Sequence, residues 1–247
     1  MAKRDIGPGM TYFDLKDVLA QRAQDRTCPI CVLSLHSVDH YLDTLLYESV
    51  NDPGIRREIR DARGFCNTHA AMLARKKDIL GLAIIHRDLV RTVLGALEQA
   101  RFRPSLRVTL ARVSGLDRNA LYPGVDELAE SLSPQRLCPA CAYQRRMEEV
   151  FISTLLRHLD DPAIRGPLEE VGLCLPHFRH ALSHVHDTTT FQTLVDIERS
   201  ALRRLAHELD ELVRKHDYRF ADEAREEEAD AWLRALRLIS GMEGLVT

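Results

Sequence analysis

The sequence predicts an all-α protein in which a tandem duplication gives two copies of one helical unit, each copy closed by a Cys3His zinc site. Aromatic residues make up 6% of the chain, Gly and Pro are few, and Leu, Ala, Arg and Glu dominate, which favours helices over strands. No stretch alternates apolar and polar residues as a half-buried strand does. A pattern of cysteine, proline, glycine and histidine residues also occurs twice in the same order.

The duplication is seen in short matches that keep their order in both halves. The separation between equivalent residues is nearly constant, so the two halves are colinear. The matches are Cys28-Pro-Ile-Cys31 with Cys138-Pro-Ala-Cys141, Thr44-Leu-Leu46 with Thr154-Leu-Leu156, Asp52-Pro53 with Asp161-Pro162, and Gly64-Phe-Cys66 plus His69 with Gly172-Leu-Cys174 plus His177.

The matches divide the chain into four expected segments. These are a first helical zinc-binding repeat at 1–102, a linker at 103–123, a second repeat at 124–215 and a C-terminal extension at 216–247. Apolar residues at helical spacing place a short amphipathic helix at the start of each repeat and a long helix at its end. The expected helices of the first repeat include about 30–50, about 55–62 and 79–101; the second repeat closes with 190–215, and the extension ends with a helix that carries Trp232 and stops at Gly241.

The six cysteines all fall inside the repeated motif, which reads C-x2-C-x34-C-x2-H and then C-x2-C-x32-C-x2-H. Two ligands separated by two residues grip one ion, and two such pairs complete the tetrahedral shell of structural zinc. The sequence therefore predicts two zinc ions and a closed shell that leaves no position for substrate. The expected ligands of one ion are Cys28, Cys31, Cys66 and His69, and those of the other are Cys138, Cys141, Cys174 and His177.

Helix starts suit these ligands. Pro29 and Pro139 stand where the first residue of a helix is expected, while Cys66 and Cys174 open the next helix after a glycine has ended the previous one. The positive end of a helix dipole favours the thiolate that zinc binds.

Two other uses of the cysteines are weighed against zinc. An iron–sulfur cluster is a less favoured cofactor, because thiolates suit both metals. A dithiol redox centre at Cys28/Cys31 or Cys138/Cys141 lacks the expected strand–helix setting and does not explain the recurring histidine. Disulfides are disfavoured in the reducing compartment inferred below.

The segment Lys215-His-Asp-Tyr-Arg-Phe220 is the second candidate site. His216, Asp217, Tyr218 and Arg219 together could bind a polar ligand. The alternative is that this segment anchors the extension and that its basic residues meet carbonyl groups at a helix end. We expect no catalytic residue, because no phosphate loop, nucleophile elbow or defined carboxylate pair is present.

Composition also limits the partners and the location. A formal charge of −3 and a pI near 6.4 make nucleic acid an unlikely partner. The N-terminus lacks the apolar core of a signal peptide, and Ile79–Ile85 is too short to span a bilayer. We therefore expect a cytoplasmic protein without a membrane partner.

The chain resembles a prokaryotic family known only as a domain of unknown function. The resemblance covers about residues 10–245 and rests on the duplicated Cys-Pro-x-Cys and Gly-x-Cys-x-x-His motifs, then His216-Asp-Tyr-Arg-Phe220 and Asp230-Ala-Trp-Leu-Arg-Ala235. Ala231 departs from the serine typical of the family motif. The resemblance implies an intracellular bacterial or archaeal protein and brings no activity, substrate or partner.

These observations favour a non-enzymatic interaction or regulatory module that binds a protein partner or a second copy of itself. An enzyme or small-ligand-binding protein using the His216–Phe220 region is one alternative. A thiol redox or metal sensor is the other.

Overall fold

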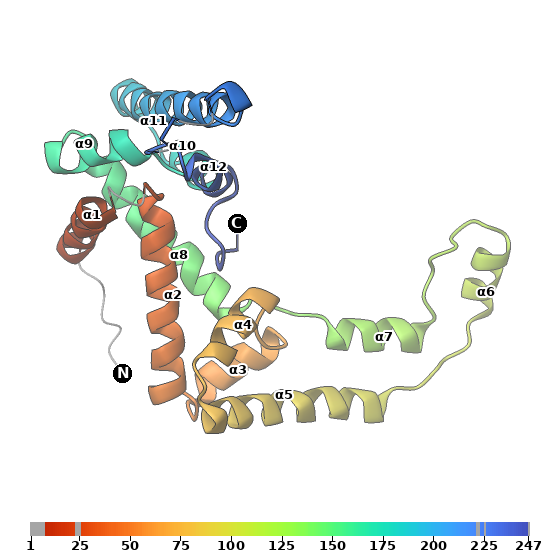
Figure 1. The fold of residues 1–247 in the computed structure, drawn as a ribbon. Helices are drawn as coiled ribbons and strands as arrows, with labels where there is room; N and C mark the ends of the chain where they lie inside the picture. The colour runs from red at the N-terminus through yellow and green to blue at the C-terminus, as the bar shows by residue number, and fades with distance from the viewer. Residues whose placement is uncertain (1–7, 23–25, 221–222, 225, 247) are drawn as a thin grey trace. The chain divides into compact units, whose positions relative to one another are not determined.

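The computed structural model describes residues 8–22, 26–220, 223–224 and 226–246, and within these residues the ordered elements are helices with no strand (Figure 1). This confirms the all-α prediction. The elements are α1 (Pro8–Arg22), α2 (Pro29–Glu48), α3 (Pro53–Asp61), α4 (Asn67–Arg75), α5 (Ile79–Gln99), α6 (Leu106–Val113), α7 (Pro123–Leu132), α8 (Pro139–Arg157), α9 (Pro162–Val171), α10 (Leu175–Leu182), α11 (Thr188–Arg214), the 3-10 helix η1 (Tyr218–Phe220) and α12 (Ala231–Ser240).

The chain forms two compact units, and each has a different part of the sequence. The terminal unit comprises residues 1–39 and 143–247, and the middle unit comprises residues 40–142. The divisions fall within α2 and α8, so these units cut across the two segments expected at 1–102 and 124–215. The helices of the two halves follow a similar order, but the duplication itself stays a prediction from sequence.

The core of the terminal unit joins six helices, α1, α2, α8, α9, α10 and α11. Leu15 and Leu19 of α1, Leu155 of α8, Leu168 of α9 and Leu194 of α11 are fully or almost fully buried in one continuous cluster. At its edge Tyr12 donates a hydrogen bond of 2.6 Å to Asp161, which also caps α9. Burial of this apolar surface is the main source of the unit's stability.

The middle unit has a smaller core and a long exposed arm. Leu42 of α2, Ile59 of α3, Leu73 of α4 and Ile85 of α5 are buried, but no apolar side chain between Ile85 and Cys138 is buried. We call residues 79–132, which form α5, α6 and α7, the arm. Helices α5 and α7 contact each other, and α6 lies at the far end of the arm from α3 and α4 (Figure 1).

The close approach at the start of α7 requires glycine. A Cβ atom on Gly124 would lie 1.7 Å from the carbonyl oxygen of Arg101, so any other residue would push the two segments apart. This position therefore fixes how α7 returns along the arm.

The C-terminal helix α12 packs against α10 and α11. It ends at Gly241, whose φ of 82° is left-handed, as the sequence predicts. Arg234 of α12 is 7% exposed and forms ion pairs with Glu208 of α11 and with Asp230, while Trp232 is 56% exposed. The Asp230 and Arg234 positions of the tail motif therefore attach α12 to the terminal unit.

Among the described residues, no helix has both the length and the apolar character needed to cross a membrane.

Candidate metal centres

Local structure places both kinds of ligand pair at helix starts, as the sequence predicts. Helices α2 and α8 begin at Pro29 and Pro139, and the carbonyl group of the preceding cysteine accepts the first intrahelical hydrogen bond in each. Cys66 and Cys174 are the N-cap residues of α4 and α10, with extended backbone. In each ligand pair both residues therefore lie within one turn of a helix start.

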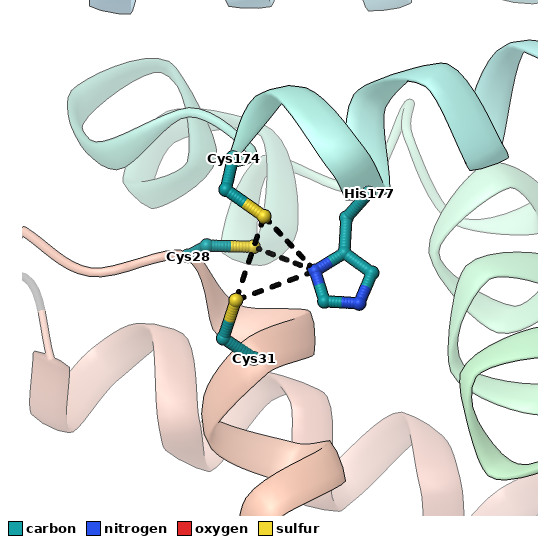
Figure 2. A group of neighbouring side chains, drawn as sticks. All are labelled: Cys28, Cys31, Cys174 and His177. Atoms are coloured by element: carbon teal, nitrogen blue, oxygen red, sulfur yellow. Dashed lines mark hydrogen bonds between the residues drawn. The ribbon is translucent and has the colours of Figure 1, made fainter. Parts of the chain in front are cut away.

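The first cluster lies in the terminal unit and joins the start of α2 to the start of α10 (Figure 2). Its members are Cys28, Cys31, Cys174 and His177. The Nδ1 atom of His177 lies 3.6, 3.3 and 3.1 Å from the sulfur atoms of Cys28, Cys31 and Cys174, and the sulfurs of Cys31 and Cys174 are 3.5 Å apart. All four residues are buried. We call this group the terminal cluster.

The second cluster lies in the middle unit and joins the start of α4 to the start of α8. Its members are Cys66, His69, Cys138 and Cys141. The Nδ1 atom of His69 lies 3.2, 3.5 and 3.4 Å from the sulfurs of Cys66, Cys138 and Cys141. Cys66 is partly exposed and the other three are buried. We call this group the middle cluster.

Two contacts hold the chain before Cys138 against the chain before Cys66. The backbone N–H of Gln135 donates to the carbonyl of Asp61 at 2.8 Å, and the Arg63 side chain donates to the carbonyl of Ser131 at 2.9 Å. These contacts bring the two ligand pairs of the middle cluster together.

The donor set fits a tetrahedral ion in both clusters. Zn–S distances of about 2.3 Å and Zn–N distances of about 2.0–2.1 Å separate ligand atoms by about 3.5–3.8 Å in a tetrahedron. The contacts of 3.1–3.6 Å are equal to or somewhat shorter than these separations, and all the ligand atoms of a cluster lie within 4.8 Å of one another. All six cysteines are free thiols, so the sulfur atoms are available as ligands.

The ligand pairing differs from the one that the sequence suggests. We expected Cys28 and Cys31 to share an ion with Cys66 and His69, but they meet Cys174 and His177, and the other two pairs meet each other. Each cluster therefore takes one pair from each half of the chain, and the prediction that each copy closes on its own ligands is wrong.

Helix length gives the physical reason. The 20 residues of α2 span about 30 Å at 1.5 Å per residue, whereas the 9 residues of α3 span only about 14 Å. Helix α3 alone therefore does not return the chain to Cys28 at the start of α2. The ligand pair Cys174 and His177, from the other half of the chain, completes the cluster with Cys28 and Cys31 instead.

The thiols of the terminal cluster influence one another's protonation. In the terminal cluster, burial disfavours a thiolate at Cys28, but hydrogen bonds with Cys174, Cys31 and His177 outweigh it and hold the pKa of Cys28 well below its usual value. Hydrogen bonds with Cys174 and Cys28 raise the pKa of Cys31. Three thiols this close do not all ionise on their own, whereas a bound dication stabilises all three thiolates.

In the middle cluster burial is the main influence. It raises the pKa of Cys138 and Cys141, and it lowers the pKa of His69. A neutral imidazole is the form in which histidine binds a metal.

The clusters differ in the contacts of the histidine Nε2 atom, the ring nitrogen that does not face the sulfurs. In the terminal cluster, the Nε2 atom of His177 lies 3.4 Å from a carboxylate oxygen of Glu148, and Gln144 donates to the same oxygen at 2.7 Å. In the middle cluster, the Nε2 atom of His69 is buried and has no hydrogen-bond partner among the described residues.

Sequence reasoning missed Gln144 and Glu148, although a signal was present. Both lie on the buried face of α8 with Met147 and Phe151, where apolar residues are expected. Two polar residues one turn apart on such a face indicate that a buried polar group nearby needs a hydrogen-bond partner.

The structure does not bring the side chains of the second candidate site together around one hollow. Tyr218 is 87% exposed, and Arg219 pairs with Asp217, two residues earlier, at 2.7 Å. The Nδ1 atom of His216 lies 2.8 Å from the carbonyl of Leu212 at the end of α11, and Phe220 lies under the Arg214 guanidinium. A ligand site at His216, Asp217, Tyr218 and Arg219 stays an untested prediction.

These features define an all-helical protein with two buried Cys/His clusters that are able to bind metal ions. The chain belongs to the family of unknown function DUF6062, which it matches over residues 10–244, in agreement with the resemblance seen in its motifs. It is also similar to a protein of Caldicellulosiruptor sp. (strain Rt8B.4) described as an uncharacterized 23.9 kDa protein in the xynA 3' region. The two are 26% identical over 228 residues, which cover 89% of this chain and 97% of that protein. No solved structure matches the chain.

Proposed function

We propose that each cluster holds one structural zinc ion and that the two ions clamp a non-enzymatic helical protein used for protein interaction. The observation that carries the zinc assignment is the closed set of three sulfurs and one imidazole nitrogen, within 4.8 Å of one another, in each unit. A closed Cys3His shell has no open position for water or substrate, which is the arrangement of structural rather than catalytic zinc.

A single ion suits these clusters better than an iron–sulfur cluster. Several iron and sulfide atoms would have to fit between the ligands. The ligand atoms of each cluster all lie within 4.8 Å of one another, with contacts of 3.1–3.6 Å among them, which leaves room for one atom. Elemental analysis of protein purified without added metal should therefore find about two zinc ions per chain and no stoichiometric iron. Iron in excess of zinc, or no metal at all, would overturn the assignment.

The arm is the surface we propose for the interaction. Leu106, Leu110 and Val113 lie at helical spacing on α6 and are 82%, 66% and 82% exposed. On α5, Val90, Leu94 and Leu97 are also exposed and share one face. A run of exposed apolar side chains along one segment is typical of an interaction surface.

Charge favours one kind of partner. Residues 79–118 of the arm carry seven arginines but only three acidic residues beside the apolar ones, so two copies of this part placed face to face would repel each other. An amphipathic helix of another protein with acidic flanks would complement both features. The arginines are Arg87, Arg91, Arg101, Arg103, Arg107, Arg112 and Arg118.

A photo-crosslinking amino acid at position 110 tests this surface in the native host. We expect one discrete adduct of the chain with a different protein, which is lost when Leu106 and Val113 are also changed to Ser. Because α6 contributes no buried residue, these changes should leave the thermal unfolding of the protein unaltered. The same crosslinker at Glu58, an exposed position of α3, serves as the control.

The outcomes separate the possible occupants. An adduct of twice the chain mass would show that the partner is a second copy of the chain and not a different protein. The same adduct pattern at positions 110 and 58 would contradict the arm as an interaction surface.

A further inference from the structure

The two clusters form a natural internal comparison, because both have three cysteines and one histidine that faces the sulfurs through Nδ1. If both hold zinc, as proposed above, any difference in how tightly they hold it comes from their surroundings.

In the terminal cluster the Nε2 atom of the imidazole has a carboxylate partner. The Nε2 atom of His177 faces Glu148 at 3.4 Å, and both side chains are buried, with exposed fractions of 3% and 7%. Gln144, which is 1% exposed, donates to Glu148 and to the carbonyl of Val246 at 2.7 and 3.0 Å. Glu148 is therefore fixed in place by α8 and by the C-terminal segment. A carboxylate in this position orients a metal-binding imidazole and makes it a stronger ligand.

In the middle cluster the imidazole has no such support. His69 is 0% exposed, and its Nε2 atom has no hydrogen-bond partner within the part of the chain that the structure describes. No hydrogen bond at Nε2 fixes the tautomer or the ring orientation of His69. Metal binding must therefore fix both, which weakens the binding.

The middle cluster is also the more accessible one. Cys66 is partly exposed, whereas all four members of the terminal cluster are buried. A chelator or an oxidant dissolved in water reaches a sulfur ligand of the middle cluster without prior opening of the core, and exposure is what makes a thiolate reactive.

We propose that Glu148 is a positioning residue for His177 and that it sets the order of metal release, with the middle cluster giving up its zinc before the terminal cluster. Loss of an outer-shell partner typically costs 10–100-fold in metal affinity, so the two sites should differ by about that factor. The protein then has one permanent zinc clamp and one that responds to metal supply or oxidant.

Stepwise release tests the order. The full chain loaded with two zinc ions is exposed to increasing chelator, the number of bound ions is followed by native mass spectrometry, and freed thiols are alkylated and mapped. At one zinc per chain we expect the label on Cys66, Cys138 and Cys141. A label first on Cys28, Cys31 and Cys174, or equal labelling of both sets, would overturn the proposal.

Variants of Glu148 test the cause. Glu148→Ala should speed zinc release from the terminal cluster about 10–100-fold and remove the order of release. Glu148→Gln keeps the volume and a neutral acceptor, so it should give an intermediate rate. Glu149→Ala is the matched control, because Glu149 is the exposed neighbour on the same helix and should release zinc as the wild type does.

Cobalt adds a readout that a purely structural role would not change. With Co²⁺ in place of zinc, Glu148→Ala should shift the absorption bands of the terminal site and leave those of the middle site unchanged. If Glu148→Ala does not fold, Glu148→Gln decides, and release at the wild-type rate in that variant would overturn the role of the carboxylate. Failure to find two zinc ions per chain would instead refute the zinc assignment on which this inference rests.

Discussion

The terminal and middle units have the same metal-ligand set but very different cores. The terminal cluster lies within a continuous apolar core that joins α1, α2, α8, α9, α10 and α11. The middle unit has fewer buried apolar residues, which lie on α2, α3, α4 and the start of α5, and the arm buries no apolar side chain beyond Ile85. One unit surrounds its metal site with a large core, and the other has a smaller core.

This comparison separates two properties that are easily confused. How tightly a site holds its ion depends on the ligands and what supports them. How much a unit depends on the ion depends on how much apolar surface it buries without it. We expect the terminal unit to hold zinc more tightly and the middle unit to need it more.

The largest expected effect comes from removing one pair of cysteines at a time. Cys138→Ser with Cys141→Ser should unfold the middle unit, because loss of the ion removes free energy comparable with the whole stability of a small domain, about 5–15 kcal/mol. Cys28→Ser with Cys31→Ser should destabilise the terminal unit but leave it folded on its apolar core. Amide hydrogen exchange measured separately over 40–142 and 143–247 distinguishes the two results.

Equal loss of protection in both units after either double substitution would break the comparison. It would show that the two units fold as one and that core size does not decide which unit depends on its metal. Zinc content of each variant, expected to be about one ion per chain, is the control for the intended loss.

Local features of the fold were predictable because they depend on neighbouring residues alone. Pro29 and Pro139 begin helices, Cys66 and Cys174 cap helices, and Gly241 ends one, as their positions in the sequence indicate. The identity of the eight clustered side chains also followed from sequence, because all six cysteines fall in one repeated pattern.

The pairing of the ligands was not predictable from the motif, because the motif is the same in both halves. A Cys-x2-Cys pair accepts either Cys-x2-His pair, and both choices give Cys3His. The choice is made by tertiary distance, through the length of α2 and the short span of α3. The role of Glu148 was not predicted for a related reason, because its partner His177 is distant in sequence and adjacent only in the fold.

A smaller effect is expected at the glycines that precede the two helix-capping cysteines. Gly172 has φ 68° and ψ −176°, a backbone region that is essentially restricted to glycine, so Gly172→Ala should cost about 1–3 kcal/mol for the backbone. Its Cβ would also lie 2.8 Å from the Cβ of Ala201, which has no room to move. Gly64 has φ 102°, and its Cβ would meet only the flexible end of Leu89 at 3.3 Å.

Denaturant unfolding of both variants should therefore show the larger loss for Gly172→Ala in the terminal unit. The zinc ligands are unchanged in both, so metal content should stay at the wild-type value. A larger loss of stability for Gly64→Ala would mean that the chain before Cys174 is not more tightly packed than the chain before Cys66.

The smallest effect concerns the ion pairs that join α3 to α5 in the middle unit. Arg60 and Arg56 lie 2.6 and 3.2 Å from the carboxylate of Asp88, and the hydrogen bond from Arg60 is the main cause of the lowered pKa of Asp88. A lowered folded-state pKa means that the stabilisation is present above the ordinary pKa of Asp and is lost as the pH falls through the lowered value. Asp88→Asn should thus cost about 0.5–1 kcal/mol at pH 7, as expected for partly exposed pairs.

The difference between wild type and Asp88→Asn should shrink as the pH approaches the lowered pKa of Asp88, and it should also shrink with added salt. Arg57→Gln is a suitable control, because Arg57 is an exposed neighbour on α3 and its loss should change neither dependence. A cost for Asp88→Asn well above 1 kcal/mol would show that a single surface pair contributes to the middle unit on the scale of its core. The middle unit would then depend less on its metal than its few buried side chains imply.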